Sequence, residues 1–138
     1  MSIDVTITNN SKEILNAEQE AVKKALTMIG IKAERFAKED CPVDTGLLRN
    51  SITYAISGES PAQTYYQADR KKPGKEQKEC GEYKGTVPND KNLSVYIGTN
   101  VEYAFPNEDR KHFLRDSATT HGELYKKITE NVLKGSAR

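Results

Sequence analysis

The chain has no tryptophan, only two cysteines and no long apolar run, and each absence narrows the class of protein. No apolar run is long enough to span a bilayer, so no membrane contact is expected. The first residues lack a basic stretch and an apolar core, so no signal peptide is expected. Without secretion, Cys41 and Cys80 are expected to be free thiols in a reducing cytoplasm.

The chain also lacks an excess of charge of either sign. Its net charge of +1 excludes a strong overall field that would draw the protein onto nucleic acid or an anionic membrane. Charged residues still make up 30% of the sequence, which favours a modest core or a surface that is partly covered in an assembly. A length of 138 residues predicts one domain over residues 1–138.

Hydrophobic periodicity predicts three strands and two helices. Residues 3–8, 47–57 and 93–98 alternate apolar and polar side chains, which is the pattern of half-buried strands. Residues 11–39 and 113–134 repeat apolar side chains at helical intervals. The order predicts an α+β fold, in which a long N-terminal helix and a C-terminal helix pack on a small antiparallel sheet of about three or four strands.

Glycine and proline mark the limits of these elements. Gly30 lies inside the first helix at a cost of ~1 kcal/mol relative to alanine, so we expect another element to cross there. Pro42 ends that helix, and Gly135 is expected to cap the last one. Residues 58–92 combine charges of both signs with Gly and Pro, which predicts a long flexible loop or an extended hairpin.

Asp44-Thr45-Gly46 is the catalytic signature of aspartic proteases. Such enzymes need two aspartates facing one water, so a chain this short would have to be a dimeric aspartic protease that uses Asp44 from each copy. A later Tyr96-Ile97-Gly98 could supply the apolar-apolar-Gly of that class. The context differs at the front, because a long helix precedes Asp44 and Leu47 follows where Ala or Ser is expected.

The same tripeptide also suits a turn between a helix and a strand. Asp44 and Thr45 have side chains that bond nearby backbone amides, and Gly46 can adopt a positive φ. This interpretation accounts for each residue without catalysis. We therefore expect no enzyme and no catalytic residue.

The stretch around this turn resembles the hallmark of a bacteriophage family. The family comprises the small tail-component proteins of long-tailed phages, typified by the gene-ten product of HK-type phages. Two weaker similarities follow in the expected order, at residues 95–104 and 113–118, although residues 105–109 depart from the family pattern and His112 and Asp116 stand where proline is usual. The residues that carry the main resemblance are Pro42, Val43, Asp44, Thr45, Gly46, Leu47, Leu48, Arg49, Asn50, Ser51 and Ile52.

The resemblance implies a non-enzymatic structural protein of a phage or prophage, made in the host cytoplasm and located in the virion. Its family is described as head–tail joining, tail-completion or neck proteins. The expected partners are neighbouring copies in a ring and other head or tail connector proteins. DNA contact is expected at most transiently, and no cofactor or small-molecule substrate is expected.

Within the long loop, aromatic and basic residues are the candidates for assembly contacts. We expect this loop to order when it binds its neighbours. Alternatively, tyrosines that stack on bases and cations that meet phosphates would make residues 70–84 a nucleic-acid site, although interleaved glutamates oppose it. The candidates are Tyr65, Tyr66, Arg70, Lys71, Lys72 and Lys75.

The histidines and cysteines have structural interpretations. His112 and His121 lack neighbouring ligands at metal spacing, so no metal site is expected. His121 lies on the apolar face of the last helix and is expected to be a half-buried packing residue. Cys41 follows a helix C-terminus, whose dipole disfavours a reactive thiolate.

Overall fold

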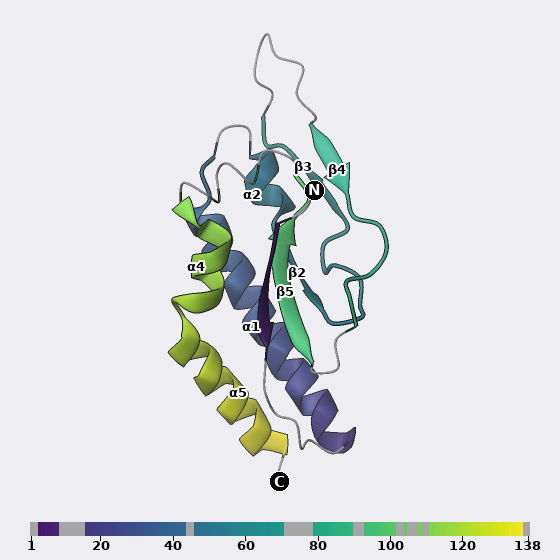
Figure 1. Ribbon diagram of the computed structural model, residues 1–138, viewed down its shortest axis with the longest axis vertical. Coiled ribbons are helices and arrows are strands. Elements are labelled where there is room, and N and C mark those ends of the chain that lie inside the picture. Colours follow the sequence, from purple (N-terminus) through teal and green to yellow (C-terminus); the bar gives the residue numbers. More distant parts are fainter. Residues whose placement is uncertain are drawn as a thin grey trace.

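The computed structural model describes residues 3–8, 16–43, 46–70, 79–89, 93–101, 104, 108 and 111–136. It confirms the predicted α+β fold, with a long N-terminal helix and helices at the C-terminal end (Figure 1). The elements in chain order are strand β1 (Ile3–Thr8), helices α1 (Asn16–Asp40) and α2 (Leu47–Ser51), strands β2 (Thr53–Ile56), β3 (Tyr65–Gln67), β4 (Cys80–Glu82) and β5 (Ser94–Thr99), and helices α4 (Phe113–Thr119) and α5 (Gly122–Ser136).

The strands form two small antiparallel sheets. The larger has the order β1-β5-β2, so the last of its strands in the sequence lies in the middle. Its register places Ile97 between Val5 on one side and Tyr54 on the other. Strands β3 and β4 form a separate hairpin, with Tyr66 opposite Gly81. Figure 1 shows this hairpin beside α2, at the end of the molecule where α1 finishes.

The core lies between the three-stranded sheet and the helices. Helix α1 packs against β2 and β5, α4 packs against β1, and α4 and α5 both run along α1. The predicted apolar stripe of α1 is the central part of this core. Its buried members include Val22, Leu26, Ile29 and Ala33, which meet Ile52, Ile97, Phe113 and Leu114 from the other elements.

The predicted close crossing at Gly30 is confirmed. A Cβ built at residue 30 would lie 2.6 Å from Cδ2 of Tyr54 and 3.0 Å from Cγ2 of Val95. Only a residue without a side chain lets β2 and β5 approach α1 this closely.

The strand predicted at 47–57 is wrong in its first half. Residues 47–51 form the short helix α2, in which Asn50 N donates to Gly46 O at 2.9 Å, and only Thr53–Ile56 is a strand. Leu47 and Leu48 are both buried. Two consecutive side chains of a strand point to opposite faces, so a helical turn is the better way to bury both in one core.

The single helix predicted at 113–134 is also wrong, because α4 and α5 are separated at Thr120 and His121. The hydroxyl of Tyr125 donates to the carbonyl of Ser117 at this break, which satisfies a backbone group that no longer continues the helix. His121 stacks on Phe36 with the ring centres 3.7 Å apart, which confirms its packing role. Gly135 lies inside α5 and does not cap it.

Residues 58–92 contain the β3–β4 hairpin, so the hairpin alternative describes this segment better than a loop without strands. Glu59 closes a turn after β2 by donating its backbone amide to Ile56 O at 2.9 Å, and Val87 N donates to Glu59 O at 3.0 Å. The start predicted for the first helix, at residues 11–15, lies outside the described residues.

Candidate functional site

The turn that precedes α2 is built around Gly46. This residue has φ of 87°, a conformation that glycine adopts without strain. A Cβ at residue 46 would lie 2.9 Å from Cγ of Asp69, two residues past the end of β3. Gly46 is therefore required by its backbone conformation, and a side chain there would also displace the Asp69 carboxyl group.

Helix α2 holds that carboxyl group with two side chains. Arg49 forms an ion pair with Asp69, and Asn50 Nδ2 donates to Asp69 Oδ1 at 2.9 Å. The same amide group of Asn50 donates to the carbonyl of Gln67 at 2.8 Å. The hydrogen bond from Asn50 and the charge of Arg49 lower the pKa of Asp69 below its ordinary value.

The last residue of α2 is tied to the second strand of the hairpin and to β5. Ser51 Oγ donates to Leu48 O at 2.6 Å and shares a hydrogen bond with Thr99 Oγ1. The carbonyl of Ser51 accepts a hydrogen bond from Tyr83 Oη, 2.5 Å away. Tyr83 Oη also accepts from the backbone amide of Asn100 at 3.2 Å. Burial raises the pKa of Tyr83 to about 12, so its phenol is neutral and available as a donor at neutral pH.

The hairpin is joined to β5 through Tyr66. Its ring lies over Gly81 on the paired strand, where a Cβ would meet Tyr66 Cζ at 2.5 Å. Tyr66 Oη donates to Asn100 Oδ1, and Asn100 Nδ2 donates to Glu82 O at 2.9 Å. These contacts, together with those of α2, form one network that we call the α2–hairpin junction. It consists of Gly46, Arg49, Asn50, Ser51, Tyr66, Asp69, Tyr83, Thr99 and Asn100.

The structure separates the two tyrosines that were predicted to make surface contacts. Tyr65 is 56% exposed, as a contact residue requires. Tyr66 is only 7% exposed, so it offers little surface for a contact in the chain by itself, and its assembly role stays a prediction. Its ring is already packed between the hairpin and the core. The outward face of the hairpin carries Tyr65, Gln67, Cys80 and Glu82, all exposed.

The remaining predicted residues lie in the core, at the surface or outside the described residues. Leu47 and Ile52 are buried in the core, and Pro42 and Val43 are exposed before the turn. Arg70 is exposed at the end of the hairpin strand. Five further predicted residues lie outside the described ranges: Asp44, Thr45, Lys71, Lys72 and Lys75.

Sequence reasoning missed the partners of the α2 residues. Asp69, Tyr83 and Asn100 were not predicted as site residues, although they carry most of the hydrogen bonds of the junction. No sequence pattern links them, because each bond joins residues 17 or more positions apart.

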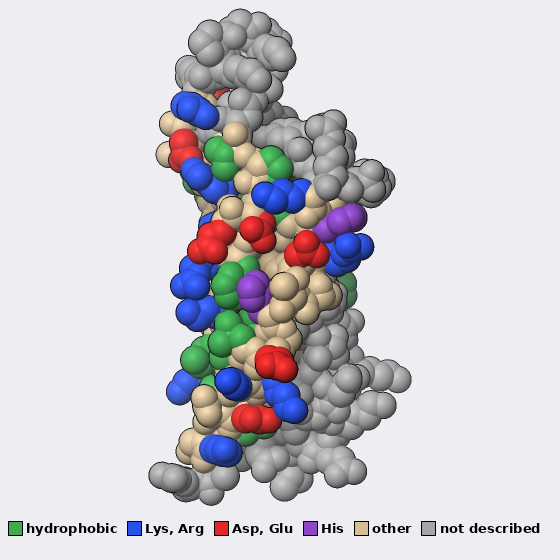
Figure 2. Space-filling model, turned by 90° about the vertical axis from the view of Figure 1, so that its left-hand side faces the viewer, with side chains coloured by type: hydrophobic (Ala, Val, Ile, Leu, Met, Phe, Trp, Pro, Cys, Tyr) green, Lys and Arg blue, Asp and Glu red, His purple; other side chains and the backbone are tan. Residues whose placement is uncertain are grey.

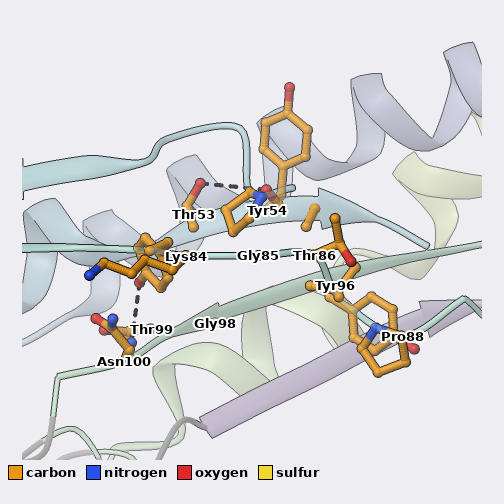
Figure 3. Close-up of a pocket in the computed structure, with 14 residues that line it drawn as sticks. Thr53, Tyr54, Lys84, Gly85, Thr86, Pro88, Tyr96, Gly98, Thr99 and Asn100 are labelled. Atoms are coloured by element: carbon orange, nitrogen blue, oxygen red, sulfur yellow. Dashed lines mark hydrogen bonds between the residues drawn. The ribbon is translucent and has the colours of Figure 1, made fainter. Parts of the chain in front are cut away.

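A pocket of about 340 Å³ lies beside this junction, between the strands β2 and β5 and the segment that follows β4 (Figure 3). Tyr96, Gly98 and Asn100 line it from the sheet, and Lys84 and Pro88 line it from the segment. In Figure 3 the ring of Tyr54 points away from the pocket toward α1. Among the described residues that line the pocket, Lys84 is the one with a formal charge at neutral pH, and this lining includes no Asp, Glu, His or Cys.

The thiol of Cys41 is buried. Cys41 is 5% exposed, and burial raises its pKa to about 12. The prediction of an unreactive Cys41 is confirmed, although burial is the larger cause and not the helix dipole. Within the described ranges, no group of three or more His, Cys, Asp or Glu side chains is placed to hold a metal ion. The helices of the described part include none long and apolar enough to cross a membrane.

Comparison of the chain with protein-family models, with curated proteins and with solved structures found no significant match. The geometry of the α2–hairpin junction and the sequence resemblance are therefore the basis for a functional proposal.

Proposed function

We propose that the protein is a non-enzymatic structural protein of a phage or prophage particle that acts at the head–tail connection or in tail completion. In this role it is a ring subunit, and the β3–β4 hairpin contacts a neighbouring copy or another connector protein. The protein is made in the bacterial cytoplasm and ends in the virion. It needs neither a cofactor nor a small-molecule substrate for this function.

The observation that carries the proposal is the set of hydrogen bonds made by the stretch that resembles the phage family. In the stretch that resembles the phage family, the side chains of Arg49 and Asn50 bond Asp69 and Gln67. The backbone carbonyl of Ser51 accepts a hydrogen bond from Tyr83, which follows β4. A stretch that fixes the direction of the β3–β4 hairpin suits an assembly protein, because an oriented surface loses less conformational entropy when it binds.

The outward face of the hairpin supports the same role. Tyr65 is a large apolar side chain that is 56% exposed, flanked by the exposed polar residues Gln67 and Glu82. Aromatic side chains are enriched at the centres of protein interfaces, where their burial supplies much of the binding energy. The hairpin thus offers one aromatic contact on a rigid base.

The first experiment is electron microscopy of an induced lysate from a strain in which the gene is deleted. We expect DNA-filled heads beside separate complete tails. Heads without tails, or tails of uncontrolled length, would move the function to tail assembly. Normal infectious particles would contradict a structural role in the virion.

Complementation of the deletion then tests the hairpin. Tyr65→Ser should fail to restore joined particles, while the purified variant keeps the far-ultraviolet circular dichroism spectrum of the wild type. Lys84→Ser is the matched control, because this exposed side chain lies beyond the hairpin strands and should restore particles fully. Equal restoration by both variants would remove the hairpin from the proposed interface.

The protease alternative has a separate test. Asp44→Asn should leave particle formation intact, because the near-isosteric amide costs at most a turn hydrogen bond, about 0.5–1.5 kcal/mol. Loss of a peptide-cleaving activity in that variant would instead favour a dimeric aspartic protease.

A further inference from the structure

Helix α1 presents a second face that the core does not use. Five of its side chains follow one another at intervals of four, four, three and four, which places them on one side of a helix. All five are exposed, and Met28 and Ile31 are 42% and 51% exposed. We call this the α1 stripe: Glu20, Lys24, Met28, Ile31 and Arg35.

A groove borders the α1 stripe. It has a volume of about 750 Å³ and lies between α1 and the last turns of α5. Ala21 and Met28 line it from α1, and Ile128 and Val132 line it from α5. Figure 2 shows this side of the molecule, with hydrophobic side chains between the charged side chains of the two helices. An apolar strip of this kind, with charged borders, is typical of a protein contact.

When two copies of the α1 stripe run in opposite directions, their charged ends are complementary. An acidic residue, Glu20, stands at its N-terminal end, and a basic residue, Arg35, stands at its C-terminal end. The apolar residues Met28 and Ile31 lie between the charged ends. A second copy that runs antiparallel therefore brings opposite charges together at both ends and the two Met28 side chains together in the middle.

We propose that α1 pairs with α1 of a second copy about a two-fold axis, to form an antiparallel helix dimer. With the axis next to Met28, Glu20 of each copy faces Arg35 of the other, and Lys24 faces Ile31. This register seats each Ile31 over the groove of the other copy, since Glu20, Lys24 and Met28 all line that groove. A symmetric pair of this kind uses the same surface twice.

The side chains of the α1 stripe are free to make these contacts. Arg35 pairs with Glu39 at 3.5 Å, but both side chains are more than half exposed, so this pair exchanges readily for a new one. The Arg35 guanidinium lies 5.3 Å from the Phe36 ring centre, at the surface. The dimer does not depend on the head–tail role, and its test is independent of any phage assay.

Sedimentation velocity of the full chain tests the pairing. We expect the mass to rise with concentration from 15.4 kDa toward twice that value, over about 1 μM to 1 mM. A constant mass of one chain across this range would overturn the proposal. Growth to larger species without a dimer plateau would also overturn it, because a two-fold contact closes at two copies.

Substitutions then locate the contact. Ile31→Lys should raise the dimer dissociation constant by roughly tenfold or more, because it places an ammonium group opposite Lys24 of the other copy in each groove. Val43→Lys is the matched control, since Val43 is a similarly exposed apolar residue, at 47%, outside α1, and it should leave the dissociation constant unchanged. Equal effects of the two variants, or none from Ile31→Lys, would overturn the proposal.

A charge exchange tests the register. Glu20→Arg and Arg35→Glu should each weaken the dimer, by roughly three- to tenfold, because each turns two attractive contacts into repulsive ones. The double variant should recover the wild-type dissociation constant. Additive weakening in the double variant would overturn the antiparallel pairing, and both single variants keep monomer folding intact because these side chains are exposed.

Discussion

The ring of Tyr54 lies directly against the backbone of Gly30, so that a Cβ added at residue 30 would be 2.6 Å from its Cδ2 atom. The contact joins the middle of α1 to the edge strand β2. Val95 of the central strand reaches the same point, with Cγ2 at 3.0 Å. The helix and the sheet thus meet at a residue that has no side chain.

Gly30→Ala should destabilise the fold, by about 1–3 kcal/mol in the free energy of unfolding, because a methyl group there overpacks the contact. The gain in helix propensity, about 1 kcal/mol, offsets part of this cost. Urea denaturation measures the difference. Gly135→Ala is the matched control in α5, where a Cβ meets open space, and it should stabilise by up to about 1 kcal/mol. Stabilisation by both variants would show that Tyr54 moves aside.

Asp69→Asn should loosen the hairpin without unfolding the core. The variant keeps an acceptor for Asn50 but loses the ion pair with Arg49. Hydrogen exchange at the Ala68 amide, which donates to Glu79 O, should become several-fold faster. Glu82→Gln removes an exposed ion pair with Lys84 in the same hairpin and should leave that amide unchanged.

Acid should loosen the hairpin in the same way as Asp69→Asn. The pKa of Asp69 is lowered in the folded protein, so the contribution of its contacts is present above the ordinary carboxyl pKa and is lost as the pH falls through the lowered value. The side-chain amide signals of Asn50 in nuclear magnetic resonance spectra report this titration. A midpoint at or above the ordinary pKa would contradict the observed contacts.

Alkaline solution should destabilise the whole fold. Burial raises the pKa of Tyr83 and of Tyr125 to about 12, against about 10 in an unfolded chain. The two tyrosines therefore contribute fully to the free energy of unfolding below about pH 10. Above that pH the free energy of unfolding falls, by at most about 1.4 kcal/mol per pH unit for each tyrosine. Urea denaturation from pH 8 to 11 measures the slope. Tyr125→Phe should lower stability at neutral pH, where the hydrogen bond to Ser117 is lost, and flatten the slope above pH 10.

The two thiols should differ sharply in reactivity. Cys80 is exposed on β4, and Cys41 is buried with a pKa of about 12. An aromatic disulfide reagent should modify one thiol per folded chain, and the second only on unfolding. Cys80→Ser should abolish the fast reaction. Equal rates for both thiols would contradict the burial of Cys41.

Periodic elements were predictable from the sequence, and short ones were not. The apolar repeat through Val22, Leu26 and Ile29 identifies α1, and the alternation in residues 3–8 and 93–98 identifies two strands within one residue of their observed bounds. Helix α2 has too few residues for a period to appear. At the separation of α4 from α5, Tyr125 donates a hydrogen bond to Ser117, a contact that no local pattern specifies.

The candidate site was predictable only as a turn. The positive φ expected for Gly46 is observed, because that requirement is local. The roles of Arg49 and Asn50 depend on Asp69, which is 20 and 19 positions away, and on the β3–β4 hairpin that places it. Such contacts are set by tertiary packing. A single sequence therefore shows which residues are polar but not which partners they meet.

The central position of β5 affects the order in which the sheet is made during translation. Ile3 pairs with Thr99, and Thr53 pairs with Gly98, so neither outer strand has its partner until residues 94–99 have been synthesised. The nascent N-terminal strand remains without a neighbour while most of the chain emerges, and its closure spans a large sequence separation that slows folding. The last strand synthesised thus completes the sheet at both of its sides in one step.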